Sequence, residues 1–224
     1  MLGAIGVDSL DDLIGDIPVE HRHPRLNLDA GLSEQELSGV FAAIAAENAS
    51  SVNGYISFLG AGAYRHYIPS TVKSILQRGE FVTAYTPYQP EAAQGTLQVG
   101  FEFQTVICQL TGMEVANAGM YDGPTAFAEA CLMAARVTKR TRIGVLSSSD
   151  ARLPETLLAY SKHQGIEIVS IDPNATEIPD DLACIGVQSP NFFGEIEDVE
   201  RFTNLTRENG ALSIVHVNPT ALGM

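Results

Sequence analysis

Short apolar runs alternate with segments of helical periodicity through the second half of the chain. Between these runs, apolar positions recur three and four residues apart, in stretches that begin near Pro124, Pro154 and Glu195. Runs rich in Val, Ile and Leu indicate strands that are buried on both faces. The alternation therefore predicts βα units and a mostly parallel sheet with helices on both sides. The apolar runs lie at residues 113–118, 142–148, 166–171, 182–188 and 212–217.

The first half of the chain carries helix signals instead. Ser9 with Asp12, and Ser33 with Glu36, form capping-box patterns ahead of apolar positions at helical spacing. We therefore predict an N-terminal helical segment over residues 1–54, followed by an α/β domain over residues 55–224.

Two more helices are predicted in the first part of the α/β domain, one ending at Gly79 and one running from just after Pro90 to Gly112. Gly95 and Gly100 lie inside the second helix, where each glycine costs about 1 kcal/mol relative to alanine. Their presence indicates that another backbone packs closely there.

The C-terminal residues 218–224 come directly after an apolar run, with no predicted helix behind it. An α/β sheet usually covers such a strand with a further crossover helix. We therefore expect the chain to be a piece of a longer subunit whose α/β domain is incomplete.

Composition narrows the classes of protein that remain. Of 224 residues, 45% are hydrophobic and 18% are charged, which is enough to form a globular core. No apolar run approaches the roughly 20 residues that span a bilayer, so we expect a soluble, cytoplasmic protein with no membrane contact. The net charge of −14 argues against nucleic acid as a partner, because phosphate backbones require clustered Lys and Arg.

The cysteines and histidines indicate no metal site. The cysteines lie in apolar segments without a C-x-x-C spacing, so we expect reduced thiols in the core. None of the histidines at positions 21, 23, 163 and 216 has neighbours at metal-ligand spacing. The three cysteines are Cys108, Cys131 and Cys184.

Three blocks of sequence could carry chemistry. Residues 58–69 combine glycines with Tyr64, His66 and Tyr67, which favours a loop packed by its own aromatic side chains over the alternative of a ligand-binding loop. Residues 83–98 place tyrosines and amides just ahead of a helix, where free N–H groups suit an anionic substrate. Glu91 in that turn is also explained by ordinary helix-dipole complementation.

The third block, residues 116–130, reads as a strand, a glycine turn and a helix start, which is a geometry that can hold a phosphate. Pro124 departs from that pattern because it removes one of the N–H groups that a phosphate would use.

In their order, these blocks resemble the P-protein of the glycine cleavage system, and in particular the first subunit of its two-subunit versions. The match runs from FLGAGAYRHYIP through AYTPYQPEAAQGTLQ and FEFQT to LTGMEVANAGMYDGPTAFAEACLMA, and it thins after about Arg142. The resemblance implies a pyridoxal-phosphate-dependent transferase fold (fold type I, aspartate-aminotransferase-like). It also implies an enzyme in which glycine forms an imine with pyridoxal phosphate, loses CO₂, and passes its aminomethyl group to the lipoyl arm of the H-protein.

The lysines of this chain do not suit the cofactor. Lys73, Lys139 and Lys162 are each better explained as solvated residues on helices or at helix ends. Asn218, at the end of a predicted strand, cannot supply the negative charge that the pyridine nitrogen needs. In the family the lysine belongs to the second subunit, so the resemblance implies pyridoxal phosphate held by a partner subunit, in an assembly with two copies of each subunit.

We therefore assign no catalytic residue to this chain and expect it to line a shared active site. Two alternatives stay open: a structural half that only stabilises its partner, and a self-sufficient pyridoxal phosphate enzyme. The expected lining residues are Tyr64, His66, Tyr85, Thr86, Tyr88 and Gln89, supported by Glu91 and Gln94.

Overall fold

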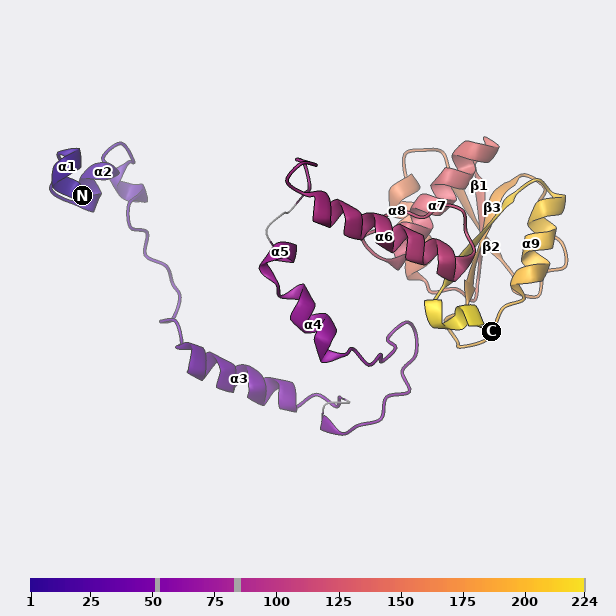
Figure 1. Cartoon of the computed structure of the whole chain (residues 1–224), viewed down its shortest axis with the longest axis horizontal. Helices are drawn as coiled ribbons and strands as arrows, with labels where there is room; N and C mark the ends of the chain where they lie inside the picture. The colour runs from indigo at the N-terminus through magenta and orange to yellow at the C-terminus, as the bar shows by residue number, and fades with distance from the viewer. Residues whose placement is uncertain (51–52, 83–85, 224) are drawn as a thin grey trace. The chain divides into compact units, whose positions relative to one another are not determined.

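The computed structural model describes residues 1–50, 53–82 and 86–223, which Figure 1 shows as ribbon. Internal contacts divide the chain into a unit from Met1 to Phe58 and a unit from Leu59 to Met224. Each unit is described by itself.

The first unit consists of short helices joined by extended chain. Both predicted capping boxes are confirmed: the hydroxyl of Ser9 accepts from the N–H of Asp12, and that of Ser33 accepts from the N–H of Glu36. None of these helices buries a side chain within this chain. The helices are α1 (Leu2–Ile5), α2 (Leu10–Leu13), the 3-10 helix η1 (Val19–His21) and α3 (Glu34–Ala46).

The second unit begins with three more helices, α4 (Ser70–Leu76), α5 (Gly79–Val82) and α6 (Gln94–Thr111). The predicted stop of α6 is confirmed, because Gly112 adopts φ 72° and donates its N–H to the carbonyl of Cys108. The side chains of α4, α5 and α6 are not buried within this chain.

A parallel sheet forms the body of the second unit. In the described residues its strands are β1 (Arg142–Leu146), β2 (Glu167–Ile171), β3 (Leu182–Ser189) and β4 (Leu212–Val217), in the order β2-β1-β3-β4. All neighbouring pairs are parallel. Every residue of β3 is buried, as expected for a central strand covered on both faces.

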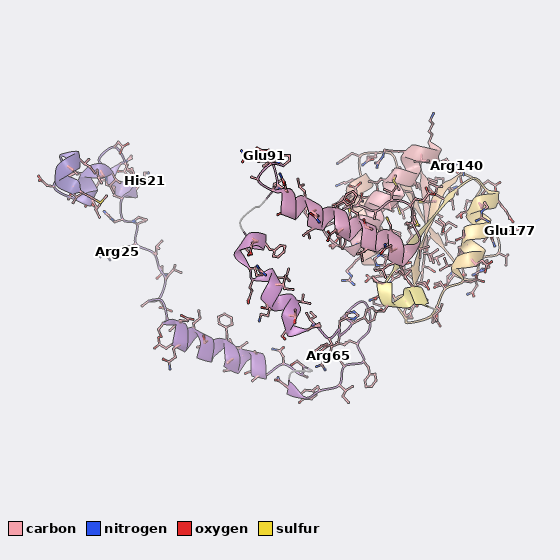
Figure 2. All side chains as sticks on the ribbon, in the orientation of Figure 1. His21, Arg25, Arg65, Glu91, Arg140 and Glu177 are labelled. Carbon is pink, nitrogen blue, oxygen red and sulfur yellow. The ribbon has the colours of Figure 1, made fainter. Side chains whose placement is uncertain are left out.

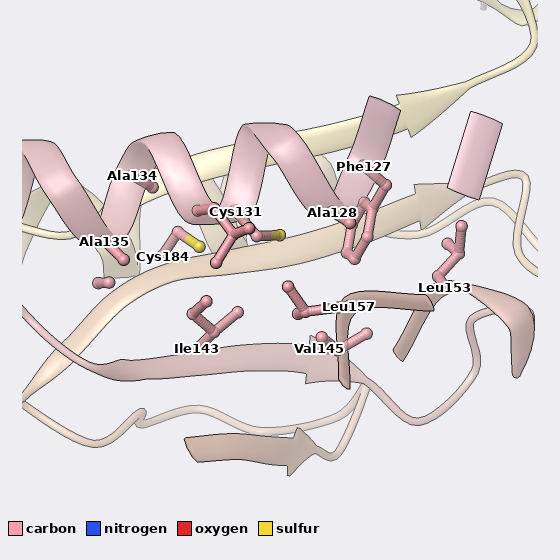
Figure 3. Close-up of a cluster of buried hydrophobic side chains, with 12 residues drawn as sticks. Phe127, Ala128, Cys131, Ala134, Ala135, Ile143, Val145, Leu153, Leu157 and Cys184 are labelled. Carbon is pink, nitrogen blue, oxygen red and sulfur yellow. The ribbon is translucent and has the colours of Figure 1, made fainter. Parts of the chain in front are cut away.

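Helices cover both faces of this sheet, which confirms the predicted three-layer arrangement. Helices α7 (Gly123–Thr138) and α8 (Arg152–Ser161) pack on one face, while α9 (Val199–Glu208) packs on the other (Figure 1). Figure 3 shows the cluster of buried side chains on the face covered by α7 and α8, in which Phe127 and Cys131 of α7 lie over the strands. Gly186 of β3 allows this approach, because a Cβ there would lie 2.2 Å from the ring of Phe127.

The buried cysteines match the expectation of reduced core thiols. Cys131 and Cys184 are fully buried, Cys108 is half-buried, and all three are free. The thiols of Cys131 and Cys184 are hydrogen-bonded, and this bond together with burial raises the pKa of Cys131. Within the described ranges, no helix is both long and apolar enough to cross a membrane.

One predicted strand and two predicted helix starts were wrong for local reasons. Residues 113–118 form no strand: no neighbouring strand pairs with them, and Val115 stays 80% exposed. Helix α8 begins at Arg152, ahead of Pro154, because the carboxylate of Asp150 accepts from the N–H of Arg152. Helix α9 begins only at Val199, because Asp198 is its N-cap.

Candidate functional site

A cavity of about 310 Å³ opens at the carboxyl ends of β1, β3 and β4. This is the edge of an open α/β sheet at which ligands usually bind. Its polar lining comes from distant parts of the second unit, namely Tyr64, Asp150, Arg152, Gln188, His216 and Asn218.

An ion pair occupies one wall of this cavity. Arg152 Nε lies 3.0 Å and 2.9 Å from the two carboxylate oxygens of Asp150. The side chain of Asp150 is only 10% exposed, and its backbone N–H donates to Gln188 Oε1 at 2.7 Å. The hydrogen bond from Arg152 lowers the pKa of Asp150, so the carboxylate stays ionised.

His216 of β4 closes the cavity toward α7. A Cβ placed on Gly123 would lie 2.7 Å from Cε1 of this ring, and the ring of Phe127 packs edge-on against it at a centroid distance of 6.4 Å. Burial lowers the pKa of His216 below its ordinary value of 6.5; Arg152 adds to this and Asp150 opposes it. The imidazole is therefore neutral at pH 7.

The N-terminus of α7 is already capped by the chain itself. Asp122 Oδ1 accepts from the N–H of Thr125 at 2.8 Å, and Thr125 Oγ1 accepts from the N–H of Asp122 at 3.1 Å. The bonds that this carboxylate accepts from the hydroxyl and from the N–H of Thr125 lower the pKa of Asp122, so it keeps its negative charge at the helix start. Pro124 contributes no N–H there. A phosphate at this position would meet a carboxylate.

The amide of Asn218 is likewise engaged within the chain. Its Oδ1 accepts from the N–H of Thr220 at 3.1 Å and from Thr220 Oγ1 at 2.7 Å. These bonds begin the 3-10 helix η3 (Pro219–Gly223) directly after β4.

These features do not fit pyridoxal phosphate held by this chain. The described residues that line the cavity include no lysine and no carboxylate at the end of β4. The helix start that would receive the phosphate carries Asp122, and the ring of His216 fills the space beneath Gly123. Among the described residues, the lining of this cavity thus offers neither a lysine for the covalent bond nor a carboxylate at the end of β4.

The lysines named from the sequence are all exposed, as predicted. Lys73 lies on α4, while Lys139 and Lys162 are the C-caps of α7 and α8. In the part of the chain that the structure describes, no group of His, Cys, Asp and Glu could hold a metal ion.

A second hollow, of about 890 Å³, lies between α5 and the start of α6. Three of the expected lining residues, Thr86, Tyr88 and Gln89, meet here. Apolar side chains of Phe81 and Val99 complete its wall, and the side chain of Tyr88 projects outward with 86% of its surface exposed.

The structure distributes the other expected lining residues more widely. Tyr64 lines the cavity at the sheet edge, while His66 is exposed on the loop that leads to α4. Glu91 lies in the turn before α6 (Figure 2), where its carbonyl accepts from Gln94 Nε2 at 3.4 Å. Gln94 thus supports the helix start. Tyr85 lies outside the described residues.

Sequence reasoning named Tyr64 and Asn218 but missed Asp150, Arg152 and Gln188 of the sheet-edge cavity, and it gave His216 no role there. Asp150 follows the predicted strand at residues 142–148, Gln188 ends the one at 182–188, and His216 lies within the one at 212–217. Parallel strands end at the same edge of a sheet. The position of these three residues after or within apolar runs could therefore have indicated that they lie together.

Comparisons with known proteins agree on one family. The family described as "Glycine cleavage system P-protein" matches residues 1–224. A Geobacillus kaustophilus protein named "Probable glycine dehydrogenase (decarboxylating) subunit 1" is 48% identical over 100% of this chain and 52% of its own. A Chlorobium limicola protein of the same name is 48% identical over 100% of this chain and 53% of its own. The chain spans about half the length of the curated relatives it matches.

A solved structure gives the same answer for the fold. The crystal structure of a glycine decarboxylase (P-protein) of the glycine cleavage system, in inhibitor-bound form, has a TM-score of 0.84 and 37% identity. The alignment covers 100% of this chain and 52% of that chain. The predicted fold-type-I architecture of pyridoxal-phosphate-dependent enzymes is confirmed. The chain belongs to the glycine cleavage system P-protein family.

Proposed function

We propose that this chain is part of the first subunit of a two-subunit glycine dehydrogenase (decarboxylating). A second subunit holds pyridoxal phosphate, which supplies the electron sink for decarboxylation of glycine. The aminomethyl group then passes to the lipoyl arm of the H-protein. One observation supports a cofactor held by the partner: Asp122 already caps the start of α7, and the ring of His216 lies against Gly123 in the lining of this cavity.

The role of this chain is to complete the shared site. Tyr88 and Gln89 offer polar tips beside the apolar wall formed by Phe81 and Val99, in a hollow large enough for a small substrate or a lipoyl arm. We assign them binding and orientation of the substrate, with no proton transfer.

An apolar stripe on α6 supports a partner subunit beside this hollow. The stripe consists of Val99, Phe103, Val106 and Leu110, which follow one another at intervals of four, three and four residues. That spacing is typical of a helix-packing seam. These side chains are 48%, 45%, 49% and 58% exposed in this chain.

The glycines of α6 also support a partner subunit along this helix. The sequence indicated a close backbone near Gly95 and Gly100, yet no described atom lies within 4 Å of a Cβ placed at either position. We propose that the second subunit packs along α6, which directly follows Thr86, Tyr88 and Gln89. The hollow would then face the partner's active site.

We also propose how the enzyme assembles and where it acts. Two copies of each subunit would form the enzyme, and it would act in the cytoplasm.

The test replaces Tyr88 and Gln89 together with Ala in the full-length subunit, reconstituted with the second subunit and H-protein. We expect glycine decarboxylation to fall by about ten-fold or more, since a misplaced substrate costs at least that much. Gel filtration should show an unchanged complex. Tyr160→Ala, on α8 and outside the hollow, is the matched control and should leave the rate unchanged.

The alternative of a purely structural half makes the opposite prediction. Under it, the double variant would assemble and decarboxylate glycine at the wild-type rate. That result would overturn the lining role and leave stabilisation of the partner as the function of this chain.

A further inference from the structure

The loop that carries Tyr64 has an unusual backbone. Gly60, Ala61 and Gly62 adopt φ values of 63°, 51° and 83°, so three successive residues lie in the left-handed region. The turn closes with a bond from the N–H of Ala63 to the carbonyl of Gly60 at 2.9 Å. Glycine accepts this conformation freely, whereas Ala61 does so only under constraint, because its Cβ crowds the backbone.

Arg152 holds this turn from the far side of the cavity. Its Nη2 donates to the carbonyl of Ala61 at 3.3 Å and lies 3.3 Å from the place where a Cβ on Gly62 would stand. The guanidinium therefore contacts the turn at Ala61, the one residue of the three that is not glycine. A side chain at position 62 would crowd the guanidinium.

The guanidinium is itself fixed by the sheet. Arg152 Nε bonds to both carboxylate oxygens of the buried Asp150, and Nη2 also contacts that carboxylate. Asp150 is in turn tied to Gln188, the penultimate residue of β3, through its backbone N–H. A continuous chain of polar contacts thus runs from the rigid end of β3 to Ala61.

We propose that Arg152, braced by Asp150, is a positioning residue that holds the loop of residues 59–69, and with it Tyr64, at the carboxyl ends of the strands. The proposal rests on the proposed function, because Tyr64 matters for catalysis only if this chain lines the shared site. An arginine is required, since one planar fork must bind a carboxylate and a carbonyl at once. A lysine can offer a single charge but no such fork.

Limited proteolysis of the full-length subunit tests this without any need for activity. Arg65, labelled in Figure 2, lies on the loop and provides a trypsin site within it. Arg152→Lys should raise the rate of cleavage after Arg65 by about ten-fold, because cleavage follows the population of the open loop. Cleavage after Arg207 on α9 should stay unchanged, which separates loop release from global unfolding.

A second test variant and a control variant complete the proteolysis experiment. Asp150→Asn should also raise cleavage after Arg65, since it removes the charge that braces Arg152. Arg136→Lys, on the exposed side of α7, is the matched control and should behave as wild type. Unchanged cleavage after Arg65 in both Arg152→Lys and Asp150→Asn would overturn the proposal.

Kinetics of the reconstituted pair then separate this proposal from the proposed function. If both hold, Arg152→Lys raises KM for glycine by about five-fold or more with a smaller change in kcat, as expected when a binding side chain is displaced. If cleavage rises while KM and kcat stay at wild-type values, the positioning of the loop stands and the lining role of Tyr64 is overturned.

Discussion

The imidazole of His216 lies so close to Gly123, the first residue of α7, that a Cβ added to this glycine would stand 2.7 Å from Cε1. This contact joins the last described strand to the start of α7, which Asp122 already caps. The chain's own ring therefore fills that space, which explains why a P-protein fold carries a cavity unsuited to the cofactor.

Gly123→Ala should destabilise the subunit by about 1–3 kcal/mol, because the new methyl group forces the buried ring to move. Urea denaturation of the full-length subunit measures this. Adding His216→Ala to Gly123→Ala should recover part of the loss, since it removes the group that the methyl meets. Gly100→Ala, where no described atom lies within 4 Å, is the control and should be neutral or stabilising. Equal losses at positions 100 and 123 would contradict the close contact.

His216 should make the subunit sensitive to mild acid. Its pKa is lowered in the folded protein, mainly by burial, so the unfolded chain binds a proton more readily. The stability it contributes is complete above about pH 6.5 and is lost as the pH falls through the lowered folded pKa. Thermal unfolding between about pH 7.5 and pH 5 should therefore show a smaller decline in Tm for His216→Gln than for wild type. Identical pH profiles would argue against a buried neutral imidazole.

The cap at Asp122 should be replaceable by another capping residue but not by alanine. Asp122→Ala removes the acceptor for the N–H of Thr125 and should lower Tm by about 2–4 °C. Asp122→Ser keeps an acceptor at the same place and should lie close to wild type. A loss that is the same for Ala and Ser would show that the carboxylate acts through something other than the cap.

The stripe on α6 should be essential for assembly. Phe103→Glu puts a charge in the middle of the proposed seam and should raise the Kd for the second subunit by at least about 100-fold. Gln109→Glu adds the same charge on the polar side of α6 and serves as the control. Calorimetric titration of the two subunits gives both values. If Phe103→Glu binds as wild type, the stripe is covered by a second copy of this chain or by the rest of the subunit.

Local signals predicted most of the fold. The capping boxes at Ser9 and Ser33 depend on residues three apart, and the buried strands depend on short apolar runs, so both are visible in the sequence. The strand expected at residues 113–118 was wrong because a strand also needs a paired neighbour, and the described residues supply none. Apolar character alone cannot provide that neighbour.

The candidate site was harder to foresee, because its contacts span long distances in sequence. The bond from Arg152 to Ala61 joins residues 91 positions apart, and nothing near Arg152 indicates it. The segment of Tyr88 and Gln89 was recognised through its resemblance to the family, and the structure places both in one hollow. Whether they line a shared active site remains a prediction.

If this subunit contributes lining residues to a cofactor that its partner holds, pyridoxal phosphate should bind covalently to the second subunit and not to the subunit that carries this chain. The full-length subunit and the second subunit should each be expressed alone, incubated with pyridoxal phosphate, treated with borohydride and examined by mass spectrometry. We predict a reduced cofactor–lysine adduct on the second subunit and none on the subunit that carries this chain. A stoichiometric adduct on a lysine of this subunit would show that the partner does not hold the cofactor alone.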